Sequence, residues 1–228
     1  SQANWVLLAA GLLVAMVSVV GLAQRWHATM RALGAEVHLH QSSRWFMTGQ
    51  LGKYAPGGVW HIVGQGELAN RGGVSRAVAY SSVILSTITL VAGAAVTVAI
   101  GSLLPGVDGV RWWAVAAGAG ALLVLLEPHL RRLLLSKVKV GADALSATQL
   151  LRLVVGCLPV WSLVGVSTWI TARAFGPGLS VLGTMVGAVG SWLVGIVTLP
   201  APGGIGVREA VLATVLKPEV GTARAALI

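Results

Sequence analysis

The same short pattern occurs twice in this chain, and both copies interrupt apolar sequence. The first copy is Ala55-Pro56-Gly57-Gly58-Val59, and the second is Ala201-Pro202-Gly203-Gly204-Ile205. Because proline clashes with the preceding helical turn and paired glycines favour no single backbone conformation, each copy predicts the end of a helix. A helix that ends at membrane depth needs protein or a water-filled cavity around its free backbone groups. Paired broken helices of this kind are typical of a transporter's substrate site.

Composition places the chain in a membrane. Of its 228 residues, 56% are hydrophobic and only 10% are charged, whereas charged residues make up about 25% of soluble domains. The formal net charge of +9 comes from Lys and Arg scattered between apolar runs, and the absence of one basic tract argues against nucleic-acid binding. The predicted fold class is all-α: a polytopic integral membrane helical bundle with two broken or re-entrant helix hairpins.

Five segments have the length and apolar character of membrane spans. They are 5–23, 77–104, 112–126, 151–170 and 181–199. The connections after the first and third spans hold ten Lys and Arg, with Arg152 at the boundary of the fourth span as an eleventh, whereas the other two connections hold only Arg111 and Arg173. Positive residues favour the cytoplasmic side, so the first and third connections are predicted to face the cytoplasm. We expect residues 1–228 to form one transmembrane domain within a longer chain.

The connection after the first span has a pattern of its own. Four apolar residues recur at helical spacing and predict an amphipathic helix on the cytoplasmic surface that ends at Gly34. They are Trp26, Met30, Leu33 and Val37. Ser43 is predicted to cap a second helix, and a third follows the break over 59–69. The broken element 43–69 therefore predicts a re-entrant hairpin, with two helices lying flat on the membrane surface as the alternative.

The second broken element covers 197–216. The fifth span leads into the Pro-Gly-Gly break, and a short helix resumes over 205–216. Glycine-rich backbone that opens a helix offers amide donors and a positive dipole end, which favour an anion such as lipid phosphate. Four small residues in the fifth span fall four apart and predict a face for close helix packing. They are Gly183, Gly187, Ser191 and Gly195.

Residues that could carry chemistry are few. The sequence has no metalloprotease, serine-hydrolase or phosphate-loop motif, and its single cysteine, Cys157, lies within an apolar run. We therefore predict no metal and no cofactor, and a transporter is favoured over an enzyme. Glu67 and Glu209 follow the two breaks, with Arg71, Arg208 and Lys53 as candidate partners. The alternatives are a charge at the cytoplasmic end of the hairpin for Glu67, and a structural ion pair between Arg208 and Glu209.

The predicted substrate-binding residues gather at the two breaks. They are Lys53, Tyr54, Pro56, Gly57, Gly58, Trp60, His61 and Glu67 at the first, and Pro202, Gly203, Gly204, Arg208 and Glu209 at the second. Arg208 is predicted to bind a lipid phosphate through two parallel hydrogen bonds, and Glu209 to orient it. A packing role for His61 and interfacial anchoring by Tyr54 and Trp60 are the alternatives.

Two motifs resemble the hallmarks of a known family. Gly52-Lys53-Tyr54-Ala55-Pro56-Gly57-Gly58-Val59-Trp60 and Pro200-Ala201-Pro202-Gly203-Gly204-Ile205-Gly206-Val207-Arg208-Glu209 are similar to the two signatures of the lysylphosphatidylglycerol synthase transmembrane-region family. The resemblance implies a helical bundle that moves lipids between leaflets, with the two hairpins facing each other. Members also sit beside glycosyltransferases and are linked to lipid-bound sugars. Because the chain has no soluble synthase domain, aminoacyl transfer is not implied.

Three functions follow from these features. The first is a flippase-like translocase of a phospholipid or a lipid-linked sugar, with anionic or phosphate-bearing lipids and a glycosyltransferase as partners. The second is a membrane-embedded glycosyl- or acyltransferase that uses Glu67 or Glu209 as its base. The third is a non-transporting subunit that anchors a glycosyltransferase.

Overall fold

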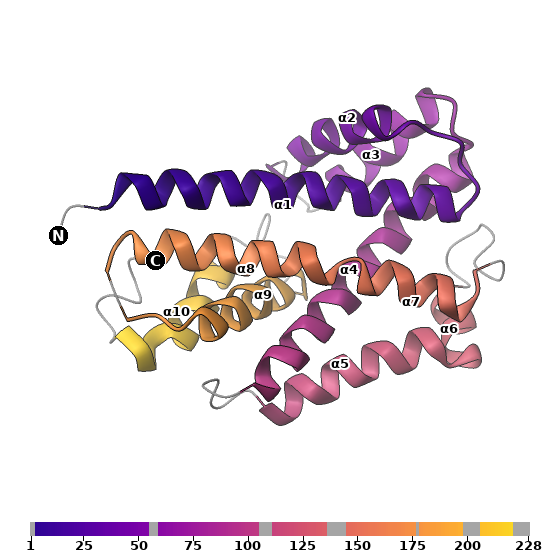
Figure 1. Ribbon diagram of the computed structural model, residues 1–228. Helices are drawn as coiled ribbons and strands as arrows, with labels where there is room; N and C mark the ends of the chain where they lie inside the picture. The colour runs from indigo at the N-terminus through magenta and orange to yellow at the C-terminus, as the bar shows by residue number, and fades with distance from the viewer. Residues whose placement is uncertain are drawn as a thin grey trace.

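The protein is helical wherever its structure is described. The computed structural model describes residues 3–54, 59–104, 111–135, 145–176, 178–197 and 206–220, and these contain helices and no strand (Figure 1). The helices are α1 Trp5–Ala32, α2 Leu39–Gln50, the short 3₁₀ helix η1 Leu51–Tyr54, α3 Trp60–Arg71, α4 Arg76–Leu103, α5 Arg111–Leu126, α6 Pro128–Leu135, α7 Ala147–Val155, α8 Leu158–Arg173, α9 Val181–Val197 and α10 Val207–Val220. The predicted all-α class is confirmed.

Three of the five predicted spans are helices long and apolar enough to cross a membrane. They are α1, α4 and the nearly continuous pair α7–α8, which covers Ala147–Arg173. A helix rises about 1.5 Å per residue, so the 28 residues of α1 extend about 42 Å. The other two predicted spans correspond to α5 and α9, apolar helices of 16 and 17 residues.

The prediction of a separate surface helix after the first span is wrong. α1 runs without a break to Ala32, so Trp26 and Met30 belong to its last turns and are buried. The Trp26 indole Nε1 donates a hydrogen bond to Ser82 Oγ of α4 at 3.0 Å, and its ring packs on Phe46 of α2. The apolar stripe therefore faces other helices. The predicted stop is confirmed, because Gly34 follows the helix with a φ of 82°.

The second helix begins earlier than predicted. α2 starts at Leu39 after the extended residue His38, so Ser43 lies inside the helix and does not cap it. The neighbouring Ser42 is buried and donates its hydroxyl to the Leu39 carbonyl at 3.0 Å. Its oxygen also lies 2.9 Å from Nδ1 of His27 in α1. These contacts hold the first turn of α2 against α1.

α4 is the central helix of the bundle and packs against α1, α3, α5, α8 and α9. One core cluster joins it to α8 and α9 through Ala94, Trp161 and Val189. The buried thiol of Cys157 also belongs to this cluster and donates to the Leu153 carbonyl. The predicted small-residue face of α9 is buried along its whole length. Close packing on that face is confirmed.

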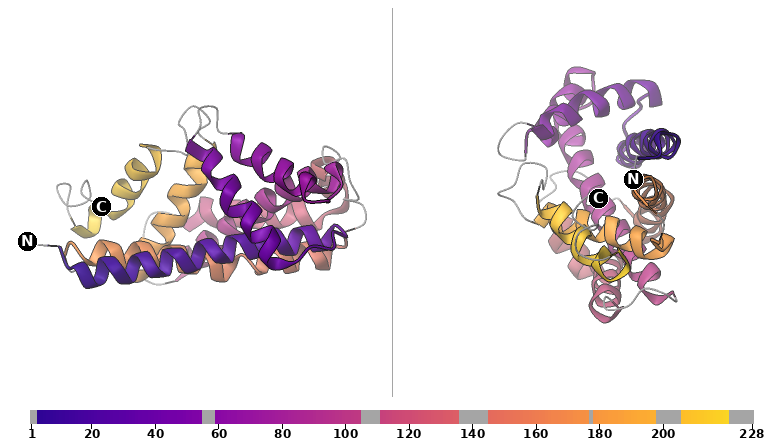
Figure 2. Two further views of the ribbon diagram at one scale, coloured as in Figure 1. Left: turned by 90° about the horizontal axis from the view of Figure 1, so that it is seen from above. Right: turned by 90° about the vertical axis from the view of Figure 1, so that its left-hand side faces the viewer.

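Two helical hairpins occupy opposite halves of the molecule. The arms of the first hairpin, α2 and α3, both have their outer ends where α1 ends and α4 begins, and the second hairpin, α9 and α10, extends toward the other end (Figures 1 and 2). In the left view of Figure 2, η1 and the start of α3 lie beside the end of α9 and the start of α10, about halfway along α1. The described inner ends of the two hairpins thus lie next to each other partway along the bundle.

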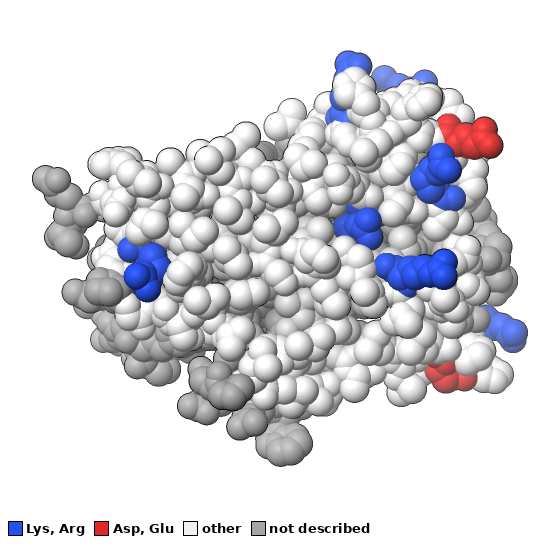
Figure 3. Space-filling view, viewed as in Figure 1, with Lys and Arg blue, Asp and Glu red and all other residues white. Residues whose placement is uncertain are grey.

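Most positive side chains lie at one end of the bundle. Figure 3 shows Lys and Arg gathered where α1 ends and α7 begins, with few at the opposite end. We call this the basic end; its exposed residues are Arg31, Arg71, Arg76, Arg132 and Arg152. The charge asymmetry expected from the sequence is therefore present along the axis of the long helices.

Candidate functional site

The first hairpin is held by close backbone contact at two levels. A Cβ on Gly49 of α2 would lie 3.0 Å from the Gln65 backbone nitrogen of α3, and a Cβ on Gly52 of η1 would lie 2.7 Å from the His61 nitrogen. Only glycine permits such approach without displacing the backbone. The contact fixes η1 against the first turn of α3, so Lys53 stands at the inner end of this hairpin.

The second hairpin begins its inner helix with a built-in cap. Gly206 has a φ of 86°, a conformation that favours glycine, and its backbone N–H donates to Glu209 Oε2 at 2.6 Å. A carboxylate three residues into a helix that accepts from the residue before it is half of a capping box. This local bond explains the Gly-x-x-Glu spacing of the second motif. It also shows that the Glu209 carboxylate stabilises the start of α10.

Arg208 lies against α9 beside the cap. Its guanidinium carbon is 5.9 Å from the centre of the Trp192 ring, a cation–π arrangement. A Cβ on Gly195 would come within 2.7 Å of Arg208 Cγ and Nε, so the missing side chain makes room for the arginine. Nε is buried, and within the described residues it has no hydrogen-bond partner. A buried guanidinium nitrogen without a partner is costly, which suits an anionic ligand.

Lys53 and Arg208 come together although they are far apart in the sequence. Lys53 and Arg208 lie within electrostatic range of each other, so their two positive charges repel. Lys53 is exposed and Arg208 half-buried. The described residues include no direct ion pair between Arg208 and Glu209. An anion placed between the cations would remove the repulsion and bind to both.

The remaining predicted residues are placed unevenly around this site. Trp60 opens α3 and is 52% exposed, His61 is half-buried behind it, and Tyr54 ends η1. Glu67 lies nearly two turns further along α3 and pairs with exposed Arg71 at 2.8 Å. Glu67 therefore lies toward the outer end of the hairpin and away from its inner end. Six predicted residues lie outside the described residues: Pro56, Gly57, Gly58, Pro202, Gly203 and Gly204.

Two neighbours of Arg208 did not figure among the predicted site residues. Trp192 offers its ring, and Gly195 leaves the space that the arginine fills. Gly195 was assigned to the small-residue face of the fifth span, a pattern that predicts packing without showing what packs there. The described residues contain no group of three His, Cys, Asp or Glu that would hold a metal ion.

The comparisons with known proteins agree with the motifs. The family model described as the lysylphosphatidylglycerol synthase TM region matches residues 1–228, the whole of this sequence. No curated protein and no solved structure matches the chain significantly. The three long apolar helices and the family match together make it a multi-pass membrane protein. The chain belongs to the lysylphosphatidylglycerol synthase transmembrane-region family.

Proposed function

We propose that this protein moves phosphate-bearing, anionic lipids between the leaflets of the bacterial inner membrane, with no covalent step. The observation that carries the proposal is that Lys53 and Arg208, one from each hairpin, lie within electrostatic range of each other. A lipid headgroup that crosses a membrane loses its water and needs fixed charges and donors at middle depth. Two cations from opposite hairpins supply these charges.

The first hairpin has the features of a re-entrant element. Each arm has 12 residues and rises about 18 Å, which is too short to cross a bilayer core of about 30 Å. Apolar side chains are exposed around its inner end, where a hairpin lying flat in water would carry polar ones. They are Met47, Leu51, Val59, Trp60 and Val63. This pattern favours insertion from the basic end over two helices lying on the surface.

The proposed mechanism uses the two hairpins as opposing gates. Entry from the cytoplasmic side delivers a headgroup to Lys53, and Arg208 then takes the phosphate through its free Nε and a terminal nitrogen. A shift of one hairpin against the other would open the site to the opposite leaflet, as in transporters with broken helices. Exposed Leu51 and Val59 offer an apolar surface for the acyl chains, which stay in the membrane.

The transferase alternative is less well supported by the acidic residues. Glu67 is engaged with Arg71 on an exposed helix surface, and Glu209 accepts the Gly206 N–H. A general base needs a free carboxylate within reach of the substrate phosphate or hydroxyl. Neither residue is placed in that way. The anchoring of a glycosyltransferase stays a prediction, with no described contact that favours it over transport.

Transport in proteoliposomes tests the proposal. Purified protein is reconstituted with fluorescent phosphatidylglycerol, and dithionite quenching measures how fast the lipid changes leaflet. We expect Arg208→Lys to slow exchange about tenfold, because lysine keeps the charge but loses the paired donors. Lys53→Gln should slow it as well. Normal exchange by a folded Arg208→Lys variant, or no exchange by the unchanged protein, would rule the proposal out.

A further inference from the structure

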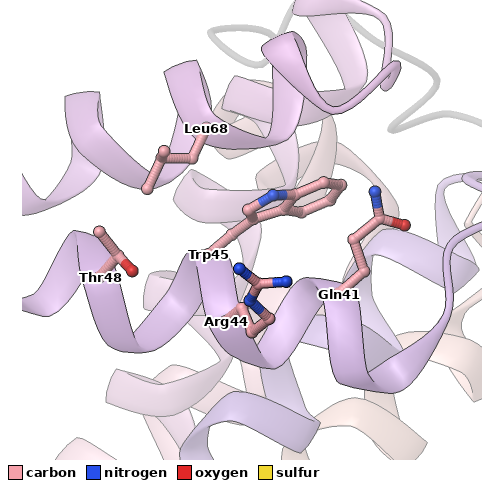
Figure 4. Close-up of a pocket in the computed structure, with 5 residues that line it drawn as sticks. All are labelled: Gln41, Arg44, Trp45, Thr48 and Leu68. Carbon is pink, nitrogen blue, oxygen red and sulfur yellow. The ribbon is translucent and has the colours of Figure 1, made fainter.

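A pocket on the first hairpin is unexplained by the site at the tips. It lies between α2 and α3, has a volume of about 300 Å³ and is lined by Gln41, Arg44, Trp45, Thr48 and Leu68 (Figure 4). This volume is at the lower end for small-molecule sites, so the pocket suits a headgroup rather than a whole lipid. None of the lining residues is acidic.

The lining residues have the chemistry of an anion site with an apolar wall. In Figure 4, Arg44 directs its guanidinium toward the Trp45 ring, with Gln41 and Thr48 on either side. Arg44 is exposed, and within the described residues it has no ion pair. Its donors are therefore available to a phosphate, and the amide and hydroxyl groups beside it can bind glycerol or ester oxygens. The Trp45 ring and Leu68 would cover the first carbons of an acyl chain.

The position of the pocket connects it with the tip site. Gln41, Arg44 and Thr48 are spaced by three and four residues, so they form one polar stripe along α2. All three are exposed. The stripe starts near the basic end and leads to Lys53 in η1 at the inner end of the hairpin. The pocket therefore lies on the surface route from the basic end to the meeting point of the two hairpins.

We propose that this pocket is the entry site for the anionic headgroup of a glycerophospholipid from the leaflet at the basic end, with Arg44 binding the phosphate. The proposal rests on the lipid transport proposed above and adds a first binding site that precedes the tips. The pocket sets how readily lipid is captured. Lys53 and Arg208 set how fast captured lipid crosses.

The entry site is tested by measuring separately the lipid fraction that half-saturates exchange and the maximum exchange rate. Exchange rates are measured while the fraction of fluorescent phosphatidylglycerol in phosphatidylcholine vesicles is varied. We expect Arg44→Gln to raise the half-saturating fraction about tenfold with an unchanged maximum rate. Arg132→Gln is the matched control, because Arg132 is exposed at the basic end on α6, outside the hairpin, and it should change neither value. A lower maximum rate with unchanged half-saturation in Arg44→Gln would overturn the proposal.

A binding measurement separates this proposal from transport itself. Phosphatidylglycerol with a photoreactive headgroup is cross-linked to the protein in nanodiscs, and the labelled peptide is identified by mass spectrometry. We expect label on residues 41–48, lost in Arg44→Gln and kept in Arg132→Gln, even if the unchanged protein moves no lipid. Absence of label on residues 41–48 would overturn the entry-site proposal and leave the transport proposal unaffected. Full protection by millimolar inorganic phosphate would overturn the lipid assignment and indicate a soluble anion.

Discussion

The two hairpins share one sequence pattern but present their cations in different ways. In the first hairpin, Lys53 precedes the break and is exposed on a short 3₁₀ helix. In the second, Arg208 follows the break and lies against Trp192 and the space left by Gly195. The arms differ too. Both α2 and α3 contain charged side chains, whereas α9 contains none.

If the protein moves lipids as proposed, this difference predicts separate roles for the two hairpins. A guanidinium held by an aromatic ring and a neighbouring helix is already positioned for its ligand, so binding costs little ordering of the side chain. Lys53 retains contact with solvent and keeps more conformational freedom. We therefore expect the second hairpin to provide the fixed phosphate-binding group and the first to guide the headgroup toward it.

Accessibility at the two ends is the strongest test of this comparison, since its outcome is all or none. Cysteine at Arg132, at the basic end, should resist a membrane-impermeant thiol reagent in intact cells and react after lysis. Cysteine at Arg173, exposed at the end of α8, should react without lysis. The reverse result would invert the assigned orientation. Wild-type protein is the blank, because its single cysteine, Cys157, is buried.

Displacing Arg208 should have the next largest effect. A methyl group at Gly195 meets Cγ and Nε of a long, flexible side chain, so we expect Gly195→Ala to fold while Arg208 leaves its position. Lipid exchange should fall by about tenfold or more, as for a lost charged hydrogen bond. Gly190→Ala is the control, because its added Cβ would meet nothing within 4 Å. Equal exchange by both variants would show that Arg208 needs no fixed position.

A substitution in the first hairpin should lower the stability of the fold more than it lowers lipid exchange. A Cβ on Gly52 would lie 2.7 Å from the His61 nitrogen, and this backbone contact leaves no easy way to relax. We expect Gly52→Ala to destabilise the protein by about 1–3 kcal/mol, seen as a lower unfolding temperature in detergent. Gly64→Ala, whose Cβ would meet Gly49 Cα at 3.7 Å, should have no such effect. If Gly52→Ala were as stable as the unchanged protein, the close backbone contact between η1 and α3 would be contradicted.

The smallest effect is expected at the exposed ion pair of α3. Surface pairs contribute about 0.3–0.5 kcal/mol on a helix, so Glu67→Gln should leave lipid exchange and unfolding temperature almost unchanged. The measurement also separates the two hypotheses for this residue. If Glu67→Gln folded normally but lowered lipid exchange more than tenfold, Glu67 would belong to the substrate-binding site, and the transferase alternative would be favoured.

The sequence predicts the elements of this fold better than their contacts. Proline and glycine act on their own backbone, so the helix ends near residues 54 and 206 follow from local chemistry. The stripe that contains Trp26 gives the same signal for a surface helix and a buried one, and only the hydrogen bond to Ser82 decides between them. The same limit applies to Gly195. Small residues at regular spacing predict that something packs closely against it, but they do not predict that this is Arg208.

The candidate site was predictable in part for the same reason. Arg208 and Lys53 stand out in apolar sequence, because charges there are rare and costly. Their proximity depends on how two hairpins from opposite ends of the bundle pack together, which is a property of the tertiary structure. The cap between Gly206 and Glu209 follows the spacing of a capping box, whereas the sequence predicts that Glu209 orients the lipid phosphate.

The described inner ends of the two hairpins lie about halfway along α1, and this position has an electrical consequence for the proposed transport. A charge that crosses the whole membrane gains or loses about 2.3 kcal/mol per 100 mV, so an anion that reaches the tips has crossed about half of that field. In a cell whose interior is negative, outward movement of a net anion is driven by the voltage, and movement of a zwitterion is not. On the proposed path, the headgroup would pass from Lys53 of the first hairpin to Arg208 of the second in this part of the field. For a net anion, the membrane potential would then favour net transport to the outer leaflet.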